Sequence, residues 1–381
     1  MKRKILSVTG TRADYGLMHA VYRNITEHPS LSLELVITGM HLLDEFGSTA
    51  DEIKKDGFRY HIIESTPRDD TKEAMALFIG DFIQKFTLFL RGTRPDILLL
   101  VGDRGEMLGA AIAGVYLGIP VAHIHGGEIT STVDEYARHA ITKLSNIHFA
   151  ATPENGDRIV RMGEDPSRVF VVGAPGLDEI LHEPLLPAEV IVRKYPLRPG
   201  EQLLLVIQHP VSLDADKSAS QMEETLKAIA ALSMRTILIY PNADAGGRAM
   251  IEAIRRFERL PFLTVSQNIP HREYLSLLSV ASVLIGNSSS GIIEAPSFGL
   301  PVVNIGTRQQ GRQRAGNVID VDHDHLAIRK AVEKALFDEE FRRAVRTCRN
   351  PYGDGRAGGR IASTLASVKI DRQLLGKKIT Y

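Results

Sequence analysis

The chain lacks tryptophan, and it contains a single cysteine among its 381 residues. The lone Cys348 excludes an intramolecular disulfide and has no neighbouring metal ligands, so a reducing compartment is the simplest interpretation. No apolar run approaches the roughly 18 residues of a membrane span. The apolar run at the N-terminus ends at Thr9-Gly10 and is too short for a signal sequence. From these absences we expect a soluble, cytoplasmic protein.

The chain also lacks a net charge, because 46 basic residues balance 46 acidic ones. This balance argues against a dedicated binder of nucleic acid or of a membrane surface, although a local basic pocket for a small anion stays compatible with it. What the chain does have is length and a hydrophobic content of 44%. The hydrophobic content suffices for a large core, and the length exceeds that of one typical domain, so two domains are expected.

Short apolar runs alternate with longer amphipathic segments. In the first half we expect strands at 5–8, 33–38, 97–101, 121–125, 148–151 and 169–172. Helical patterns lie between them, at 15–28, 74–91, 106–117 and 134–144. Alternation of this kind indicates a parallel sheet that helices cover on both faces.

The pattern pauses over a proline-rich stretch that contains Pro184, Pro187, Pro196 and Pro199. It restarts with expected strands at 203–208, 236–240, 263–265, 283–285 and 301–304. We therefore predict an α/β protein with two doubly wound, Rossmann-like domains. The predicted parts are a first domain over 1–180, a linker over 181–200, a second domain over 201–355 and a final helix over 356–381 that packs back on the first domain.

The segment IGNSSSGIIEAP (285–296) combines the end of a strand, a turn of small residues and a helix-like sequence. Such a turn presents backbone N–H groups and hydroxyls at a helix N-terminus, where a phosphate is bound. Glu294 follows within reach of a ribose diol. An ordinary serine-capped loop explains the segment equally well when it is taken alone.

Loops that follow the strands of the first half carry charged residues at the edge where doubly wound sheets bind ligands. The first loop, GTRADYG, lacks the GxGxxG fingerprint, but its Arg12 suits a phosphate. The loop after 97–101 places Asp103 beside Arg104. Taken alone, Asp103 and Glu106 are better explained as a capping box that starts the next helix.

The loop after 121–125 is richer in ionisable groups. His123 and His125 are two apart on the expected strand, so they would point the same way and could bind a metal together with Glu128. Acid–base chemistry beside a phosphate explains the same residues, and we expect no metal. Asp134 and Arg138, four apart on a helix, would pair on its surface.

Polar residues also follow the strands of the second half. His209 ends one strand, Asn242 and Asp244 follow the next, and Arg308 comes after the strand that follows the GNSSSG turn. A single arginine in a loop is usually a solvated side chain. Polar loops after nearly every strand of both domains indicate a ligand-binding function.

With these motifs in place, the sequence resembles the UDP-hydrolysing UDP-N-acetylglucosamine 2-epimerases that supply sialic-acid-type sugar pathways. The matching segments are TRADYG (11–16), GDRGEM (102–107), AHIHGGEIT (122–130), VDEYARHAITKL (133–144), GNSSSGIIEAPSFGLPVVNIGTRQQGR (286–312) and NVI (317–319). The resemblance implies a fold of the GT-B type with a UDP-sugar in the interdomain cleft. It also implies a homodimer or homotetramer and no cofactor.

The reaction implied by the resemblance has two steps. A base removes the proton on sugar C2 while UDP leaves from C1, which gives a glycal-like intermediate. Water then adds at C1 and a proton returns to the opposite face of C2, so that UDP and the 2-epimeric free sugar are released. A weakly acidic C–H bond and a departing diphosphate require a positioned base and electrostatic stabilisation.

The resemblance also implies roles for particular residues. For proton transfer it implies Asp103 and Asp134, with Glu135 beside them, and for the diphosphate or its leaving oxygen it implies Arg104 and His209. The expected substrate-binding set is Arg12, Asp14, Glu128, Asn242, Asp244, Ser288, Ser289, Ser290, Glu294 and Arg308. One departure concerns catalysis: His125 stands where well-known members carry a catalytic glutamate, and histidine serves as acid or base near neutral pH.

Two substrates fit the motifs: UDP-N-acetylglucosamine, which would give N-acetylmannosamine, and UDP-2,4-diacetamido-2,4,6-trideoxyglucose, on the way to legionaminic-type acids. A slight preference goes to the first. A GT-B glycosyltransferase would share the nucleotide loops, but the paired acids at Asp134-Glu135 disfavour it. A non-hydrolysing epimerase would keep UDP attached, and the sequence Gly126-Gly127-Glu128 differs from the loop typical of that group. A non-catalytic sugar-nucleotide sensor is a further alternative.

Overall fold

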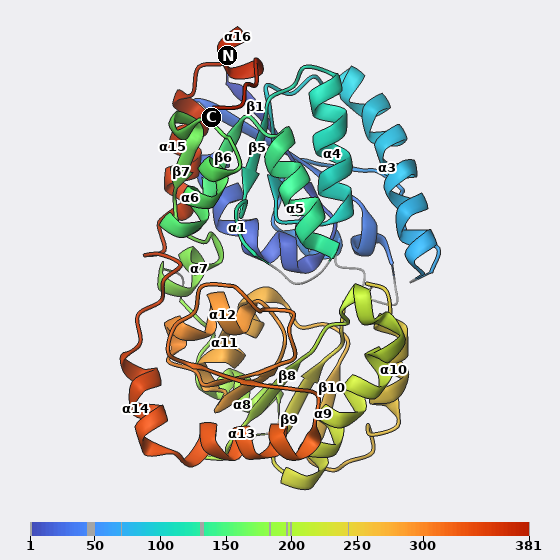
Figure 1. The fold of residues 1–381 in the computed structure, drawn as a ribbon, viewed down its shortest axis with the longest axis vertical. Coiled ribbons are helices and arrows are strands. Elements are labelled where there is room, and N and C mark those ends of the chain that lie inside the picture. The colour runs from blue at the N-terminus through green and yellow to red at the C-terminus, as the bar shows by residue number, and fades with distance from the viewer. Residues whose placement is uncertain are drawn as a thin grey trace. The chain divides into compact units, whose positions relative to one another are not determined.

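The computed structural model describes residues 2–43, 50–69, 71–129, 133–182, 184–195, 197–198, 200–242 and 244–380. Pro196 and Pro199 of the expected linker and Thr130 of the AHIHGGEIT motif lie outside these residues. The chain forms two compact units (Figure 1). Unit 1 comprises Met1–Glu128, Val133–His182 and Tyr352–Tyr381, and unit 2 comprises Ile129–Thr132 and Glu183–Pro351. Within the described ranges, no helix combines the length and apolarity that crossing a bilayer requires.

Unit 1 contains a seven-stranded parallel sheet in the order β3-β2-β1-β4-β5-β6-β7. The strands are β1 (Arg3–Thr9), β2 (Leu31–Ile37), β3 (Tyr60–Ile62), β4 (Ile97–Val101), β5 (Val121–Ile124), β6 (Ile147–Ala150) and β7 (Val169–Val171). The order reverses between β1 and β4, which is where doubly wound sheets bind their ligands. The doubly wound fold expected from the sequence is therefore confirmed for this unit.

Helices cover both faces of the unit 1 sheet. Successive strand residues alternate between two apolar clusters, so that Ile5 packs with α1 and Leu6 with α3. The helical elements are α1 (Arg12–Glu27), η1 (Gly39–Leu42), α2 (Ala50–Lys55), α3 (Lys72–Thr93), α4 (Gly105–Tyr116), α5 (Val133–Leu144), α6 (Pro153–Arg161), η3 (Pro166–Arg168), α7 (Gly176–His182), α15 (Ala357–Ser367) and α16 (Arg372–Leu375). One cluster joins the sheet to α1 and α15, and the other joins it to α3 and α4.

Unit 2 repeats this architecture with a six-stranded parallel sheet in the order β10-β9-β8-β11-β12-β13. Its strands are β8 (Leu204–Ile207), β9 (Thr236–Ile239), β10 (Leu263–Ser266), β11 (Val283–Gly286), β12 (Val302–Ile305) and β13 (Val318–Val321). Its helical elements are α8 (Ala188–Lys194), η4 (Ser212–Lys217), α9 (Ser218–Leu232), α10 (Gly247–Arg255), α11 (His271–Val280), α12 (Ser290–Ile293), η5 (Ala295–Phe298), α13 (His325–Phe337) and α14 (Glu339–Thr347). The order reverses between β8 and β11, which places the β8 and β11 loops at the ligand-binding edge.

The stretch expected to be a linker is partly structured. Within it, α8 buries Ile191, and Tyr195 donates a hydrogen bond to Glu273 on α11. These contacts place the described part of 184–195 in unit 2. Proline-rich composition therefore marks a boundary here without excluding a helix, because Pro187 occupies the N-cap position, where a missing N–H costs nothing.

The C-terminal segment belongs to unit 1 although it follows unit 2 in the chain. Helix α15 packs against α1 and contributes Ile361 and Leu365 to the cluster that also contains Val21 and Ile25. Further along, Asn146 donates from Nδ2 to the carbonyl of Leu374 at 2.9 Å. The apolar cluster and this hydrogen bond attach the last helices to the sheet.

A buried ion cluster attaches the end of the chain to the same unit. The carboxylate of Glu164, which is 3% exposed, contacts Lys143, Lys377 and His148 at 2.7, 2.6 and 3.1 Å. Burial by itself would raise the pKa of Glu164, but hydrogen bonds from His148, Lys143 and Lys377 lower it to about 2. Burial also lowers the pKa of Lys377, yet Lys143 shares the carboxylate, so Glu164 keeps a cationic partner.

This cluster predicts an acid-dependent loss of stability. The pKa of Glu164 in the folded state lies below its ordinary value of 4.5, so its stabilising effect is present above that value and is lost as the pH falls toward 2. We expect Glu164→Gln to remove this part of the acid dependence, worth roughly 2–3 kcal/mol. Urea midpoints of wild type and variant at about pH 6 and about pH 3 measure it. Equally steep losses in both proteins would contradict the assignment.

Candidate functional site

The loops after β1, β4 and β5 bring the charged residues of unit 1 to one edge of its sheet. Parallel strands end at the same edge, so Arg12, Asp103, Arg104, His125 and Glu128 gather there although up to 116 positions separate them in the chain. This gathering agrees with the expectation from the sequence. The contacts among the side chains differ from it in several ways.

Arg138 connects the loops after β4 and β5 at this edge. It lies on α5 but is only 2% exposed, and its guanidinium donates to the carboxylate of Asp103 and, at 2.7 Å, to the carbonyl of His125. The carboxylate of Glu128, itself 2% exposed, lies 4.0 Å away. Burial would lower the pKa of Arg138, but Asp103 and Glu128 raise it, so the cation is retained. The expected surface pair of Arg138 with Asp134 is therefore wrong, because Arg138 points inward to the loops after β4 and β5.

His125 is held in an unusual backbone conformation. Strand β5 ends at Ile124, and His125 has φ of +64°, a left-handed value that few residues other than glycine adopt. Its Nδ1 contacts Oε1 of Glu128 at 2.5 Å. When the neutral ring donates its Nδ1–H to this carboxylate, Nε2 is the hydrogen-bond acceptor. This buried Nε2 has no hydrogen-bond partner among the described residues.

The ring of His123 has other hydrogen-bond partners than the ring of His125. Its Nε2 contacts the carbonyl of Gly102 at 2.8 Å and its Nδ1 contacts Thr142, while burial lowers its pKa to about 3 and keeps the ring neutral. The alternative of a metal bound by His123, His125 and Glu128 assumed one continuous strand, whereas the strand ends before His125. Among the described residues, the group whose atoms have metal-ligand spacing is Glu224, Asp324 and His325 in unit 2, where His325 and Lys227 already contact Glu224.

Asp134 and Glu135 occupy the first turn of α5. Both are half-buried, and Glu135 contacts His139 one turn along at 3.3 Å. The charge of Asp134 acts on Arg138 in the same sense as the charges of Asp103 and Glu128. Glu135 acts on Arg138 in the same sense, whereas the carboxylates with a contact to its guanidinium described above are those of Asp103 and Glu128.

A second cluster surrounds Arg104. The Nε of Arg104 donates to Oε1 of Glu106 at 2.9 Å, and Glu106 is 1% exposed. Arg104 forms the N-cap of α4 without a side-chain cap, so the capping box of Asp103 and Glu106 is absent. Asp14, which forms the capping box of α1 with Thr11, lies close by. Partial burial raises the pKa of Asp14 to about 7 against the opposing effect of Arg104, and Glu106 adds to the rise.

Gly10 makes room for this second cluster. A Cβ atom at Gly10 would lie 1.7 Å from Oε1 of Glu106. We expect Gly10→Ala to displace Glu106, release Arg104 and cost about 1–3 kcal/mol through overpacking. Catalytic activity should fall with it. Gly80→Ala on α3 is the matched control, because nothing lies within 4 Å of the added atom and alanine favours a helix. Equal thermal midpoints for the two variants would contradict this role of Gly10.

In unit 2, the loops after β8 and β11 are tied together by Asn287. Its side chain accepts from the N–H of His209 at 2.7 Å and donates to the carbonyl of His209 at 2.9 Å. The preceding Gly286 has φ of +130°, and a Cβ there would lie 2.0 Å from the carbonyl oxygen of Ile207. Only glycine therefore permits this close approach at the sheet edge.

The imidazole of His209 has a defined proton position. Its Nδ1 accepts from the N–H of Asn242 at 3.1 Å, so the neutral ring carries its proton on Nε2. That tautomer donates a hydrogen bond, as a phosphate oxygen requires. Asn242 also donates from Nδ2 to the carboxylate of Asp244, which fixes the loop after β9.

The serines after β11 have different environments. Ser288 and Ser289 are half-buried, whereas the hydroxyl of Ser290 bonds to the carboxylate of Glu294 and to the hydroxyl of Tyr274. The helix-like sequence expected after the turn forms a single α-helical turn, α12, followed by η5. Glu294 ends that turn and is 4% exposed, so its hydrogen bond with Ser290 also stabilises the turn.

Two arginines complete the predicted set. Arg308 donates from Nη1 to the carbonyl of Asn287 at 3.2 Å, which places its guanidinium beside the loop after β11. Arg12, at the start of α1, lies 3.6 Å from the carboxylate of Glu52 on α2. The structure thus places Arg308 at the serine loop of unit 2 and Arg12 at the β1 edge of unit 1.

Three residues of these clusters were absent from the expected set: Glu106, Arg138 and Asn287. Arg138 and Glu106 are almost completely buried charges, and Asn287 fixes the backbone of another loop. The signal for Asn287 was its place between Gly286 and the serines. Nothing in the local sequence around Arg138 distinguishes it from a solvated arginine on a helix.

Known proteins resemble this chain over most of its length. A family described as UDP-N-acetylglucosamine 2-epimerase matches residues 23–366. A Legionella pneumophila protein named UDP-N,N'-diacetylbacillosamine 2-epimerase (hydrolyzing) is 41% identical over the full length of both chains. A UDP-N-acetylglucosamine 2-epimerase of Neisseria meningitidis serogroup B is 33% identical over 87% of each chain.

The fold has relatives among solved structures. The crystal structure of a Neisseria meningitidis UDP-GlcNAc 2-epimerase bound to UDP-GlcNAc superposes with a TM-score of 0.81 and covers 95% of this chain and 99% of the other. At 20% identity in that alignment, the likeness concerns the fold. The two-unit architecture of this chain is therefore of the GT-B type.

Proposed function

The chain belongs to the UDP-N-acetylglucosamine 2-epimerase family, and on this premise we propose that it hydrolyses UDP-N,N'-diacetylbacillosamine with inversion at sugar C2. The observation that carries the choice of substrate is the 41% identity, without gaps in coverage, to a relative named for this sugar. UDP-N-acetylglucosamine is the second candidate, favoured by the 33% identical meningococcal relative. Both reactions release UDP and a free sugar.

Unit 1 supplies the groups for proton transfer in this proposal. The Nδ1 atom of His125 is held by Glu128, and its buried Nε2 atom serves as a hydrogen-bond acceptor. This arrangement orients the imidazole for general base catalysis. Asp103 is a second proton-transfer group on the same edge, with Arg138 fixing its carboxylate. We assign removal of the C2 proton and its return on the opposite face to His125 and Asp103, with Asp134 in support.

Unit 2 supplies the groups for the departing nucleotide. A diphosphate leaving from C1 gains negative charge, and pre-positioned donors stabilise that charge in the transition state. His209 as an Nε2–H donor, Arg308 and the hydroxyls of Ser288 and Ser289 are assigned to the diphosphate. Water then adds to C1 of the glycal intermediate, and the proton of that water balances the one returned to C2.

A proton NMR time course in D₂O tests the reaction and the substrate together. With each UDP-sugar in turn, we expect free UDP and a reducing 2-epimeric sugar that carries deuterium at C2, formed faster from the diacetamido sugar. A faster reaction of UDP-N-acetylglucosamine would transfer the proposal to the second candidate. An intact nucleotide sugar with exchanged C2 would refute hydrolysis, and no reaction with either sugar would refute the epimerase assignment.

A further inference from the structure

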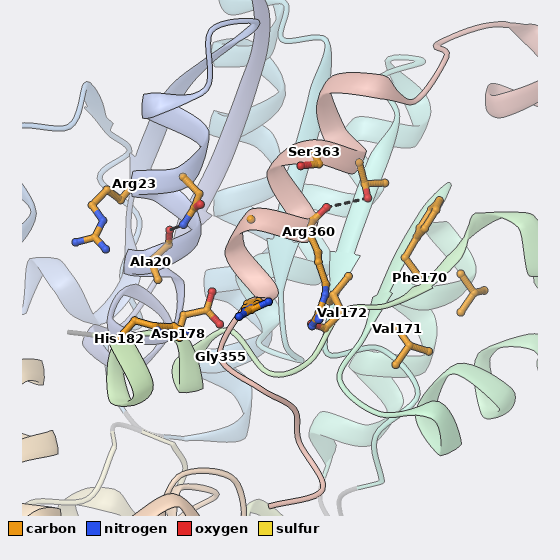
Figure 2. A pocket seen from close by; sticks show the side chains of 15 residues that line it. Ala20, Arg23, Phe170, Val171, Val172, Asp178, His182, Gly355, Arg360 and Ser363 are labelled. Atoms are coloured by element: carbon orange, nitrogen blue, oxygen red, sulfur yellow. Dashed lines mark hydrogen bonds between the residues drawn. The ribbon is translucent and has the colours of Figure 1, made fainter.

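A groove in unit 1 lies among α1, β7, α7 and the start of α15 (Figure 2). Its volume is about 980 Å³, which is within the range of small-molecule sites. The residues that line it include none of those assigned above to proton transfer or to the nucleotide. The groove therefore needs an explanation of its own.

The groove carries a concentration of positive charge. Arg356, at the N-cap of α15, and Arg360, one turn along, line it together with Arg23 from α1 and His182 from α7. Arg360 is held in place by Asp354, with two contacts of 2.8 Å, and by the carbonyl of Val172 at 2.9 Å. The exposed side chain of Arg356 makes no hydrogen bond or ion pair with any residue that the structure describes.

One acid lines the groove, and its charge is directed to the backbone. The two carboxylate oxygens of Asp178 accept from the N–H groups of Ala357 and Gly358 at 2.9 and 2.6 Å. The side chain is 7% exposed, so it is turned into the protein toward the first turn of α15. Asp178 therefore organises that turn and leaves the guanidinium of Arg356 to an external anion.

The opposite wall of the groove is apolar. In Figure 2, Phe170 and Val171 of β7 lie across from Arg360 and Ser363 of α15. Val171 is 48% exposed although it is part of a strand, because β7 is the edge of the sheet. A cationic side and an apolar side together match a molecule that has an anionic group and a hydrocarbon part.

The groove also adjoins two of the points where the chain passes between the units. The chain leaves unit 1 after His182 and returns to it at Tyr352, three residues before Gly355. His182 and Gly355 both line the groove. A molecule bound there would therefore contact unit 1 beside both of these points.

We propose that this groove binds a small organic phosphate, with the phosphate held by Arg356 beside the Arg360–Asp354 pair and the apolar part lying against β7. Arginine suits a phosphate because its planar fork donates two parallel hydrogen bonds. Arg23 adds positive charge to the same groove. The proposal is independent of the reaction assigned above, since it uses other residues.

Calorimetric titration with phenyl phosphate tests the proposal, and the dependence of binding on Arg356 and Ser363 distinguishes the groove from the nucleotide loops. We expect binding with a Kd below about 1 mM. Arg356→Gln should weaken it about tenfold, the effect of one lost charge-assisted contact. Ser363→Glu, which adds a carboxylate on the exposed face of α15, should weaken it similarly. Neither variant should change the rate of UDP release in the absence of phenyl phosphate.

Two matched controls accompany these variants. Arg161→Gln removes an exposed arginine of α6, and Ser367→Glu adds a carboxylate one turn beyond Ser363, outside the groove. Both should bind phenyl phosphate like wild type. Absence of binding in wild type, or equal affinity in Arg356→Gln, would overturn the proposal. Benzoate binding as tightly as phenyl phosphate would overturn the assignment to a phosphate.

Discussion

Asp103→Asn is expected to lower kcat by about a thousandfold and to leave KM within a fewfold of wild type. The asparagine keeps an oxygen that accepts from Arg138, so the loop after β4 should hold its position. What it loses is the ability to exchange a proton with the substrate and the negative charge that balances Arg138. The loss should therefore appear in the chemical step. The rate of UDP release with saturating sugar nucleotide measures kcat directly.

Asp157→Asn is the matched control for this change. Asp157 is exposed on α6, in the same unit but away from the charged loops, and the variant should keep the wild-type rate. Thermal midpoints of both variants should lie near that of wild type, which would separate a catalytic effect from unfolding. A kcat for Asp103→Asn within about threefold of wild type would remove Asp103 from the mechanism and leave proton transfer to His125 and Asp134.

Arg138→Met is expected to destabilise unit 1 by about 3–5 kcal/mol, because breaking a buried ion pair leaves its partner uncompensated. Methionine has a similar length but no donor, so Asp103, Glu128 and the carbonyl of His125 would all lose their hydrogen bond or their counter-charge. Glu128 is the costliest of these, since only 2% of it is exposed. Hydrogen exchange of amides in β4 and β5 at increasing urea would localise the loss to this unit.

A second substitution separates charge from packing. In the double variant Arg138→Met/Glu128→Gln, a neutral amide replaces one of the buried carboxylates that lost its counter-charge. The loss of stability should therefore be smaller than in Arg138→Met alone. Arg329→Met breaks an exposed pair with Glu333 on α13 and should cost under about 0.5 kcal/mol. A loss for Arg138→Met no larger than for Arg329→Met would show that the buried guanidinium contributes little to folding.

The sequence allowed prediction of the central strands but missed two at the edges. Strands such as β4 are buried on both faces, so their residues form the continuous apolar run that marks a parallel strand. In β3 and β13, most residues are half-buried or exposed, and Tyr60, His61 and Asp320 interrupt the apolar pattern. Such strands form because a neighbouring strand offers unpaired backbone groups, and a short stretch of sequence contains no trace of that neighbour.

The candidate site shows the same division. Loop positions follow from strand order, which is why Asp103, His125 and His209 could be placed at sheet edges beforehand. The contacts of Arg138 could not, because its partner Asp103 lies 35 positions earlier and on another loop. Likewise, the left-handed conformation of His125 changed the direction of a side chain that regular strand geometry would have paired with His123. Both features depend on tertiary contacts.

The return of Tyr352–Tyr381 to unit 1 has a consequence for biosynthesis. Unit 2 is almost continuous in the chain, so it can fold as soon as its last strand and helices have left the ribosome. Unit 1 lacks α15 until residues 357–367 have been made, which is after unit 2, and until then the apolar surface of α1 that Ile361 and Leu365 cover is exposed to solvent or to a chaperone. Of the two units, the one whose synthesis begins first is thus completed second, and a premature stop anywhere before residue 352 leaves it unfinished.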